Sequence, residues 1–159
     1  MNDDANAQYG IGIYFTNSMD MAESYGKNIH TININPKNFV DSSDDIDSVI
    51  TVNKMISLFK KLFIQNEEAA YMFVTDYGFD VESHKELSPK QYKELSEMIS
   101  GQEFRNFIIE LSQVFGVVEF VRTWNELIPN IHGTKTIHDA DNEVYIYSVM
   151  NTNYIIQGK

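Results

Sequence analysis

The sequence contains no cysteine. This absence excludes a disulfide framework, a thiolate zinc site and a cysteine nucleophile, and it favours a reducing, intracellular setting. The chain also has no run of about 18 apolar residues, the length that a membrane-spanning helix needs. Its first residues, Met1-Asn-Asp-Asp, lack the basic flank and the apolar segment of a secretion signal. We therefore expect a cytoplasmic protein without a membrane partner.

Positive charge is scarce as well. Twelve Lys and Arg face 23 Asp and Glu, which gives a formal net charge of −11. Because nucleic-acid-binding proteins gain much of their affinity by neutralising phosphates, nucleic acid is not expected as a partner. The pair Lys60-Lys61 lies in an amphipathic stretch and is typical of a solvated helix surface. A chain of 159 residues is long enough for one core, so we expect a single domain over residues 1–159.

Strand patterns occur towards both ends of the chain. Ile11–Phe15 is short, apolar and aromatic, and Ile29–Ile34 alternates in part with a period of two. Between them, Met19–Tyr25 has the length of two helical turns, with possible caps at Asn17 and Ser18 before it and Gly26 after it. Three further strands are expected near the C-terminus, at Val117–Val121, Glu143–Met150 and Tyr154–Ile156.

The middle of the chain is predicted to be helical. Apolar residues recur at helical spacing from Val49 to Phe63. Further helices are expected over Glu67–Tyr77, from Ser88-Pro89 to Ile99, and over Glu103–Phe115 with a stop at Gly116. Strands at both ends with a helical insert at about residues 45–116 indicate an α+β fold. The apolar faces of this insert are explained either as core or as a surface that binds a partner.

Two tyrosines could face one slot in the first strand–helix unit. A glycine-flanked strand carries Tyr14, and the short helix carries Tyr25. A flat aromatic ligand such as nicotinamide would stack between the two rings. By its residues alone, the segment is also explained as ordinary core.

The same segment resembles a known motif. Gly10-x-Gly12-Ile-Tyr14-Phe15, followed by Ala22 and by Tyr25, is similar to the second motif of the ADP-ribosyltransferase superfamily, in its poly(ADP-ribose) polymerase branch. The resemblance implies a split β-sheet core and binding of NAD as a substrate. It assigns cofactor contacts to Gly12, Tyr14, Phe15 and Tyr25.

A second match lies near the C-terminus. Asn142-Glu143-Val-Tyr-Ile-Tyr147 resembles the Asn-Glu-aromatic strand that carries the catalytic glutamate in the same branch. Cleavage of the bond between nicotinamide and ribose passes through an oxocarbenium-like state, which a fixed carboxylate stabilises. Glu143 is therefore the predicted catalytic residue. Considered alone, it would be an exposed glutamate at the start of a strand.

The first motif of that family is a histidine followed by glycine and a small hydroxyl residue, upstream of the tyrosines. Only nine residues precede Gly10, and none is histidine, whereas His132-Gly-Thr134 spells the motif far downstream. His132 is thus a further candidate for NAD binding. Three explanations stay open: a rearranged chain order that brings His132 into the site, a chance match, or a degenerate protein that binds without catalysis.

The resemblance covers about Tyr9–Pro36 and His132–Ile156. It implies an enzyme that transfers ADP-ribose from NAD to a protein acceptor and releases nicotinamide, with an effector or phage-encoded role by analogy. The alternative is an inactive relative that uses its acidic surface to block a basic site on a partner protein. The four histidines are scattered, so no metal site is predicted.

Overall fold

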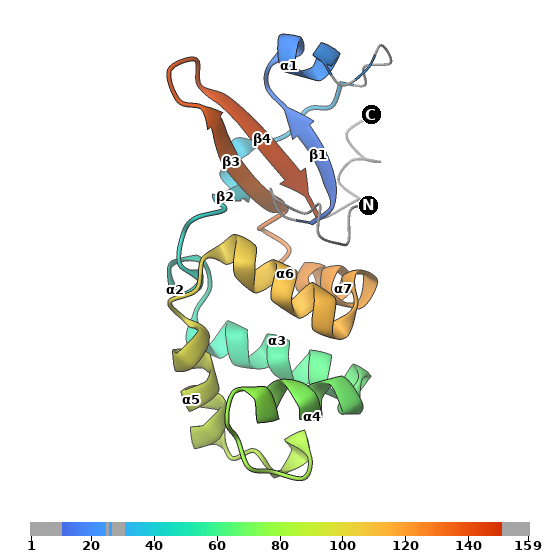
Figure 1. The fold of residues 1–159 in the computed structure, drawn as a ribbon, viewed down its shortest axis with the longest axis vertical. Helices are drawn as coiled ribbons and strands as arrows, with labels where there is room; N and C mark the ends of the chain where they lie inside the picture. Colours follow the sequence, from blue (N-terminus) through green and yellow to red (C-terminus); the bar gives the residue numbers. More distant parts are fainter. Residues whose placement is uncertain (1–10, 25, 27–30, 151–159) are drawn as a thin grey trace.

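A four-stranded sheet lies at one end of the molecule and a helical bundle at the other in the computed structural model, which describes residues 11–24, 26 and 31–150 (Figure 1). The strands are β1 (Ile13–Thr16), β2 (Phe39–Asp41), β3 (Gly133–Asp139) and β4 (Val144–Val149). Their order in the sheet is β1-β4-β3-β2. β4 pairs antiparallel with β1 and with β3, and β2 pairs parallel with β3. The two strands expected to carry the site are therefore direct neighbours.

The bundle contains the chain between β2 and β3. Its helices are α2 (Ile46–Val49), α3 (Val52–Gln65), α4 (Glu67–Asp76), α5 (Pro89–Ile99), α6 (Phe104–Phe115) and α7 (Val117–Leu127). Shorter elements are α1 (Met19–Ser24) and the 3-10 turns η1 (Pro36–Asn38) and η2 (His84–Glu86). Helices α6 and α7 lie between the sheet and the layer of α3, α4 and α5 (Figure 1).

Polar side chains fix the starts of three bundle helices. Thr51, Asn66 and Ser88 each accept a hydrogen bond from a backbone N–H in the first turn of α3, α4 and α5. Gln91 returns a hydrogen bond to the backbone of Ser88 and completes a capping box. Each such cap stabilises a helix by about 1 kcal/mol. The Ser88-Pro89 signal for a helix start is confirmed.

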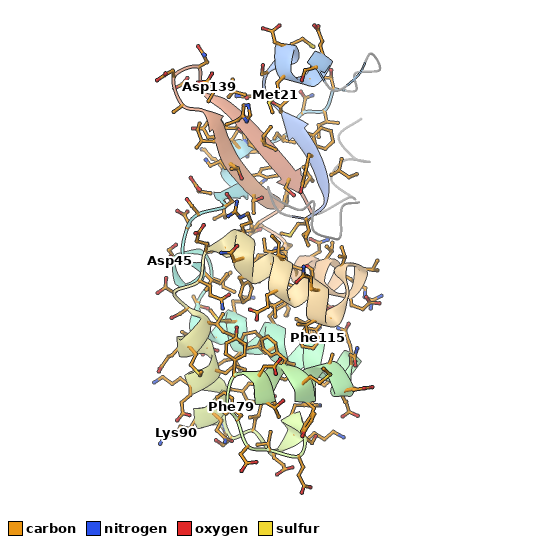
Figure 2. All side chains as sticks on the ribbon, in the orientation of Figure 1. Met21, Asp45, Phe79, Lys90, Phe115 and Asp139 are labelled. Atoms are coloured by element: carbon orange, nitrogen blue, oxygen red, sulfur yellow. The ribbon has the colours of Figure 1, made fainter. Side chains whose placement is uncertain are left out.

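One large apolar core joins the bundle to the near end of the sheet. Fully buried aromatic side chains such as Phe59, Phe63 and Trp124 form its centre. Ile11, just before β1, and Met150, just after β4, belong to the same core. The end of the sheet where β1 begins thus packs on the bundle. Asp139, the last residue of β3 before the turn to β4, lies at the far end (Figure 2).

The predicted strand at Val117–Val121 is wrong, because these residues form the first part of α7. Gly116, with φ of +96°, ends α6 and begins α7 without a loop. The buried residues Phe120, Val121 and Trp124 recur at helical spacing and face α3 and α6. Helical periodicity therefore outweighs the β-branched pair at the start of the segment.

Other sequence predictions have mixed outcomes. The mixed α+β fold class is confirmed, and β4 confirms the strand expected at Glu143–Met150. The expected strand at Ile29–Ile34 is not found in its described part, since residues 31–35 have no regular secondary structure. The strand expected at Tyr154–Ile156 lies outside the described residues. β2 and β3 were not predicted.

No helix in the part of the chain described above is both long and apolar enough to cross a membrane.

Candidate functional site

Tyr14 and Phe15 occupy opposite faces of the sheet. Tyr14 lies opposite Ser148 on β4, and Phe15 lies opposite Tyr147. Because successive residues of a strand point to opposite faces, the two aromatic rings cannot contact the same face of a ligand. Phe15 packs against a small apolar cluster formed by Phe39, Tyr147 and Val149, which gives it a structural role. Tyr14 is half-buried on the other face.

Gly12 is required by the approach of β1 to β4. Its φ is +107°, and a Cβ atom added to it would lie 2.1 Å from the backbone oxygen of Val149. Neither the conformation nor the space permits another residue without a shift of the chain. The protein's own strand therefore accounts for Gly12 without a ligand contact.

Asn17 connects the tyrosine-bearing segment to the turn that contains Glu143. The Nδ2 atom of Asn17 donates to the backbone carbonyl of Glu143 at 2.9 Å, and its Oδ1 atom accepts from the backbone N–H of Tyr145 at 2.8 Å. The two sequence motifs, which lie more than a hundred positions apart along the chain, are thereby joined in space. Sequence reasoning treated Asn17 only as a possible helix cap and missed this contact.

Glu143 is the last residue of the turn between β3 and β4. Its side chain is exposed, and its φ of +53° is the only positive value among the described residues other than glycine. Asp139 organises the other side of the turn, since Oδ1 accepts from the backbone N–H groups of Asp141 and Asn142 and Oδ2 accepts from the Asn142 side chain. These hydrogen bonds hold the pKa of the Asp139 carboxyl below its usual value. The turn presents the Glu143 carboxylate to solvent at the end of the sheet away from the bundle.

His132 lies at the opposite end of the hairpin. It directly precedes β3, its backbone N–H donates to the carbonyl of Asn38, and its carbonyl accepts from the N–H of Met150. The half-buried ring meets Phe39 edge-on, with ring centroids 6.3 Å apart. Burial lowers the pKa of His132, and a hydrogen bond with the Pro129 backbone opposes this effect. The surroundings are those of a histidine packed between the sheet and the bundle.

The structure thus brings together only part of the predicted site. Glu143 lies beside Asn17, and Tyr14 lies on the neighbouring strand, opposite a residue five positions further along β4 than Glu143. At about 3.3 Å per residue, this offset corresponds to roughly 16 Å along the strand. Tyr25 lies outside the described residues. Within those residues, no group of three or more His, Asp or Glu side chains could hold a metal ion.

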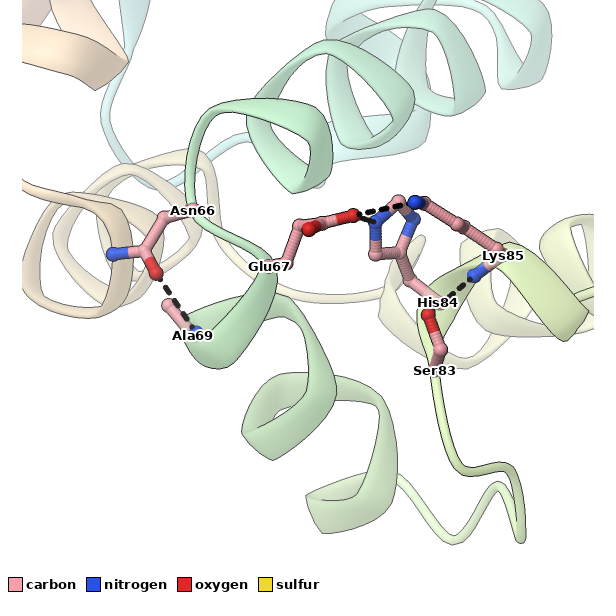
Figure 3. A network of polar contacts seen from close by, with 6 residues as sticks. All are labelled: Asn66, Glu67, Ala69, Ser83, His84 and Lys85. Atoms are coloured by element: carbon pink, nitrogen blue, oxygen red, sulfur yellow. Dashed lines mark hydrogen bonds and ion pairs between the residues drawn. The ribbon is translucent and has the colours of Figure 1, made fainter.

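A separate polar cluster occurs in the bundle. The buried ring of His84 places Nε2 3.3 Å from Oε1 of Glu67, and Nζ of Lys85 lies 3.2 Å from the same oxygen (Figure 3). Hydrogen bonds from Lys85, the larger cause, and from His84 lower the pKa of Glu67. His84 also meets the Phe63 ring edge-on at 5.7 Å between centroids. The cluster joins α4 to η2 and serves packing of the bundle.

A shallow polar hollow runs along α6. It has a volume of about 470 Å³ and is lined by Gln102, Asn106, Ile109, Glu110 and Gln113. At its edge, the Tyr77 hydroxyl donates to the Glu110 carboxylate at 2.9 and 3.0 Å and accepts from the Gln102 amide at 3.0 Å. None of these residues belongs to the two sequence motifs.

Comparison of the chain with protein-family models, with curated proteins and with solved structures finds no match.

Proposed function

We propose that the protein is an ADP-ribosyltransferase that binds NAD along β1 and β4, transfers ADP-ribose to a protein acceptor and releases nicotinamide. The observation that carries this proposal is the junction at Asn17, which places the tyrosine-bearing segment against the turn with Glu143. The sequence resemblance assigns these two segments to one site. An ADP-ribosyltransferase-like fold, with the bundle inserted between the two segments, is part of the same proposal.

In this reaction the bond between C1′ of the ribose and the nicotinamide nitrogen breaks, and nicotinamide leaves with the electron pair. A nucleophile of the acceptor bonds to C1′ and loses a proton. Positive charge develops on the ribose as the bond breaks, and the Glu143 carboxylate stabilises that charge. Its position at the exposed end of the hairpin leaves room for a macromolecular acceptor beside it.

Tyr14 supplies an aromatic surface for the nicotinamide end of the substrate. It shares its face of the sheet with Thr16, the β1 residue nearest to the turn with Glu143. Because nicotinamide is bonded directly to C1′, the Tyr14 ring and the Glu143 carboxylate have to reach towards each other past Thr16 to contact the two sides of that bond. Stacking on an aromatic ring adds about 0.5–1.5 kcal/mol to the affinity beyond burial of the surface.

Calorimetric titration of the full chain with NAD tests this part of the proposal. We expect saturable binding that weakens in Tyr14→Ala and persists in Phe15→Leu, because Phe15 packs on the other face. Absence of heat at millimolar NAD, or equal loss in both variants, would contradict an NAD site on the Tyr14 face.

A second candidate function is a non-enzymatic protein-binding inhibitor. The position of His132 at the far end of the hairpin from Glu143 favours it, because His132, the candidate for the histidine of the first family motif, then lies outside the site. The net charge of −11 would attract a basic partner. Such an inhibitor would bind its partner more weakly as ionic strength rises and would be indifferent to NAD, whereas the transferase would depend on NAD and on Glu143.

A further inference from the structure

The side chain of Asn17 extends the pairing of β1 with β4 by one position. Backbone pairing between these strands runs from Ile13 opposite Val149 to Thr16 opposite Ile146. At the next position, the Asn17 amide takes the place of a peptide group. It donates to the carbonyl of Glu143 and accepts from the N–H of Tyr145. One side chain thus satisfies the backbone groups on both sides of Val144.

The backbone of Glu143 is held in a conformation that glutamate disfavours. Its φ of +53° lies in the left-handed region, which mainly glycine, asparagine and aspartate adopt. Glu143 ends an exposed turn, and its own N–H makes a long hydrogen bond of 3.4 Å to the carbonyl of Ala140. The Asn17 hydrogen bond to the Glu143 carbonyl is therefore the shorter of the two contacts that fix this conformation. The direction in which the carboxylate leaves the backbone depends on it.

Asn17 is itself anchored on both sides. Thr16 belongs to β1, and its Oγ1 atom accepts from the N–H of Ser18 at 3.1 Å. Ser18 caps α1, since its Oγ atom accepts from the N–H of Met21 at 3.2 Å. The amide of Asn17 therefore starts from a fixed corner between β1 and α1, rather than from a free loop. Any shift of this corner is transmitted to the Glu143 backbone.

The amide group suits this role for two reasons. Asparagine carries both a donor group, its NH2, and an acceptor, its carbonyl oxygen, which match the carbonyl and the N–H that it meets. It is also uncharged, so that it adds no charge beside the Glu143 carboxylate. Aspartate would keep the acceptor for Tyr145 but would place a second negative charge beside the turn and leave the Glu143 carbonyl without its donor.

From these contacts we infer that Asn17 is the positioning residue for Glu143: it holds the Glu143 backbone in its left-handed conformation and so sets the direction of the catalytic carboxylate. This inference rests on the proposed transferase function. It assigns to Asn17 a role that acts through Glu143, because the Asn17 side chain contacts the backbone of the turn with Glu143 and not the substrate.

The test compares steady-state nicotinamide release by the full chain in four forms: wild type, Asn17→Ala, Asn17→Asp and Asn66→Ala. Asn66 is the matched control, because it is also an asparagine that binds a backbone N–H, at the start of α4 in the bundle. We expect Asn17→Ala to lower kcat by about tenfold or more with KM for NAD changed by less than about threefold, since Glu143 acts in the transition state. Asn66→Ala should leave kcat unchanged.

Urea unfolding separates positioning from a general loss of stability. Asn17→Asp keeps the acceptor for the Tyr145 N–H but lacks the donor to the Glu143 carbonyl, so kcat should fall although the protein stays folded under the assay conditions. A purely structural role for Asn17 would lower kcat only in proportion to the unfolded fraction. Faster exchange of the Tyr145 amide hydrogen in Asn17→Ala would report loss of the contact itself.

Three results would overturn the inference. If Asn17→Ala releases nicotinamide with the wild-type kcat, Asn17 does not position Glu143, although the transferase function stands. If Asn66→Ala loses kcat by the same factor as Asn17→Ala, the effect is one of overall stability. If the wild type itself releases no nicotinamide, the transferase function fails first and the role of Asn17 fails with it.

Discussion

His132 and Glu143 lie at opposite ends of the hairpin formed by β3 and β4. His132 directly precedes β3, and Glu143 directly precedes β4, after the turn. The seven residues of β3 span roughly 20 Å at about 3.3 Å per residue. A histidine and a glutamate at this separation cannot both contact one ribose. The His132-Gly-Thr134 sequence therefore needs an explanation other than an NAD-binding motif.

The first prediction concerns activity. His132→Gln should release nicotinamide at the wild-type rate, because the ring packs on Phe39 at the far end of the sheet from Glu143. Measurement of kcat/KM for NAD in the two proteins checks this. A fall of about tenfold or more at equal stability, a loss of roughly 1.4 kcal/mol of transition-state binding, would return His132 to the site.

The second prediction concerns the contribution of His132 to the stability of the folded protein as pH changes. Burial lowers the pKa of His132 below its ordinary value of 6.5, so the unfolded chain binds the proton more readily than the folded chain. The contribution of His132 to stability is thus fully present above about pH 6.5 and is lost as pH falls towards the lowered pKa.

Urea unfolding of wild type and His132→Gln at pH 7.5 and at a pH near 5.5 measures this contribution. The wild type should lose more unfolding free energy between these two values than the variant does. An equal loss in both proteins would show that the histidine does not contribute to the pH dependence.

The third prediction concerns the close approach of β3 to β4. A Cβ atom on Gly133 would lie 1.8 Å from the backbone oxygen of Ser148, whereas a Cβ atom on Gly101 would meet no atom within 4 Å. Gly133→Ala should therefore lower the free energy of unfolding by at least about 3 kcal/mol, and Gly101→Ala should change it by about 0.5 kcal/mol or less. Equal stability of the two variants would contradict the register of the hairpin.

Local sequence signals predicted much of the fold. The helix starts at Ser88-Pro89 and the stop at Gly116 depend on capping and on backbone conformation, which act over a few residues. The strands β2 and β3 have weak local signals, because their formation depends on pairing with segments far along the chain. For the same reason, Val117–Val121 carried a misleading β-branched pattern that packing against α3 and α6 overrides.

The candidate site shows the same division. The resemblance to a known family picked out Tyr14 and Glu143 as members of two motifs, and β1 and β4 prove to be neighbours in the sheet. The contact between Asn17 and Glu143 could not be predicted, because it depends on which residues meet across the end of two strands. The opposite faces of Tyr14 and Phe15 follow from strand alternation, and the motif by itself does not reveal them.

The fourth prediction concerns Tyr77 in the bundle. Burial first, and then the hydrogen bond to Glu110, raise the pKa of Tyr77 to about 12. Because an unfolded tyrosine ionises near 10.0, the contribution of Tyr77 to stability is complete below pH 10 and is lost as pH rises towards 12. Tyrosinate absorbance should show a group that titrates near 12 and disappears in Tyr77→Phe. In Glu110→Gln, the Tyr77 hydroxyl should titrate at lower pH, because the hydrogen bond to the carboxylate is lost. If the titration near 12 remained in Tyr77→Phe, the assignment to Tyr77 would be wrong.

The fifth prediction concerns the catalytic role of Glu143. Nicotinamide release from NAD is measured for wild type and for Glu143→Gln, with and without cell extract as a source of acceptor. The substitution keeps the shape of an exposed side chain and removes its charge, so both proteins should unfold at the same urea concentration. We expect wild type to release nicotinamide and to label an acceptor with ADP-ribose, and Glu143→Gln to be slower by about 100-fold or more while it still binds NAD. Release at equal rates by both proteins, or no release by wild type in the presence of extract, would contradict the transferase function.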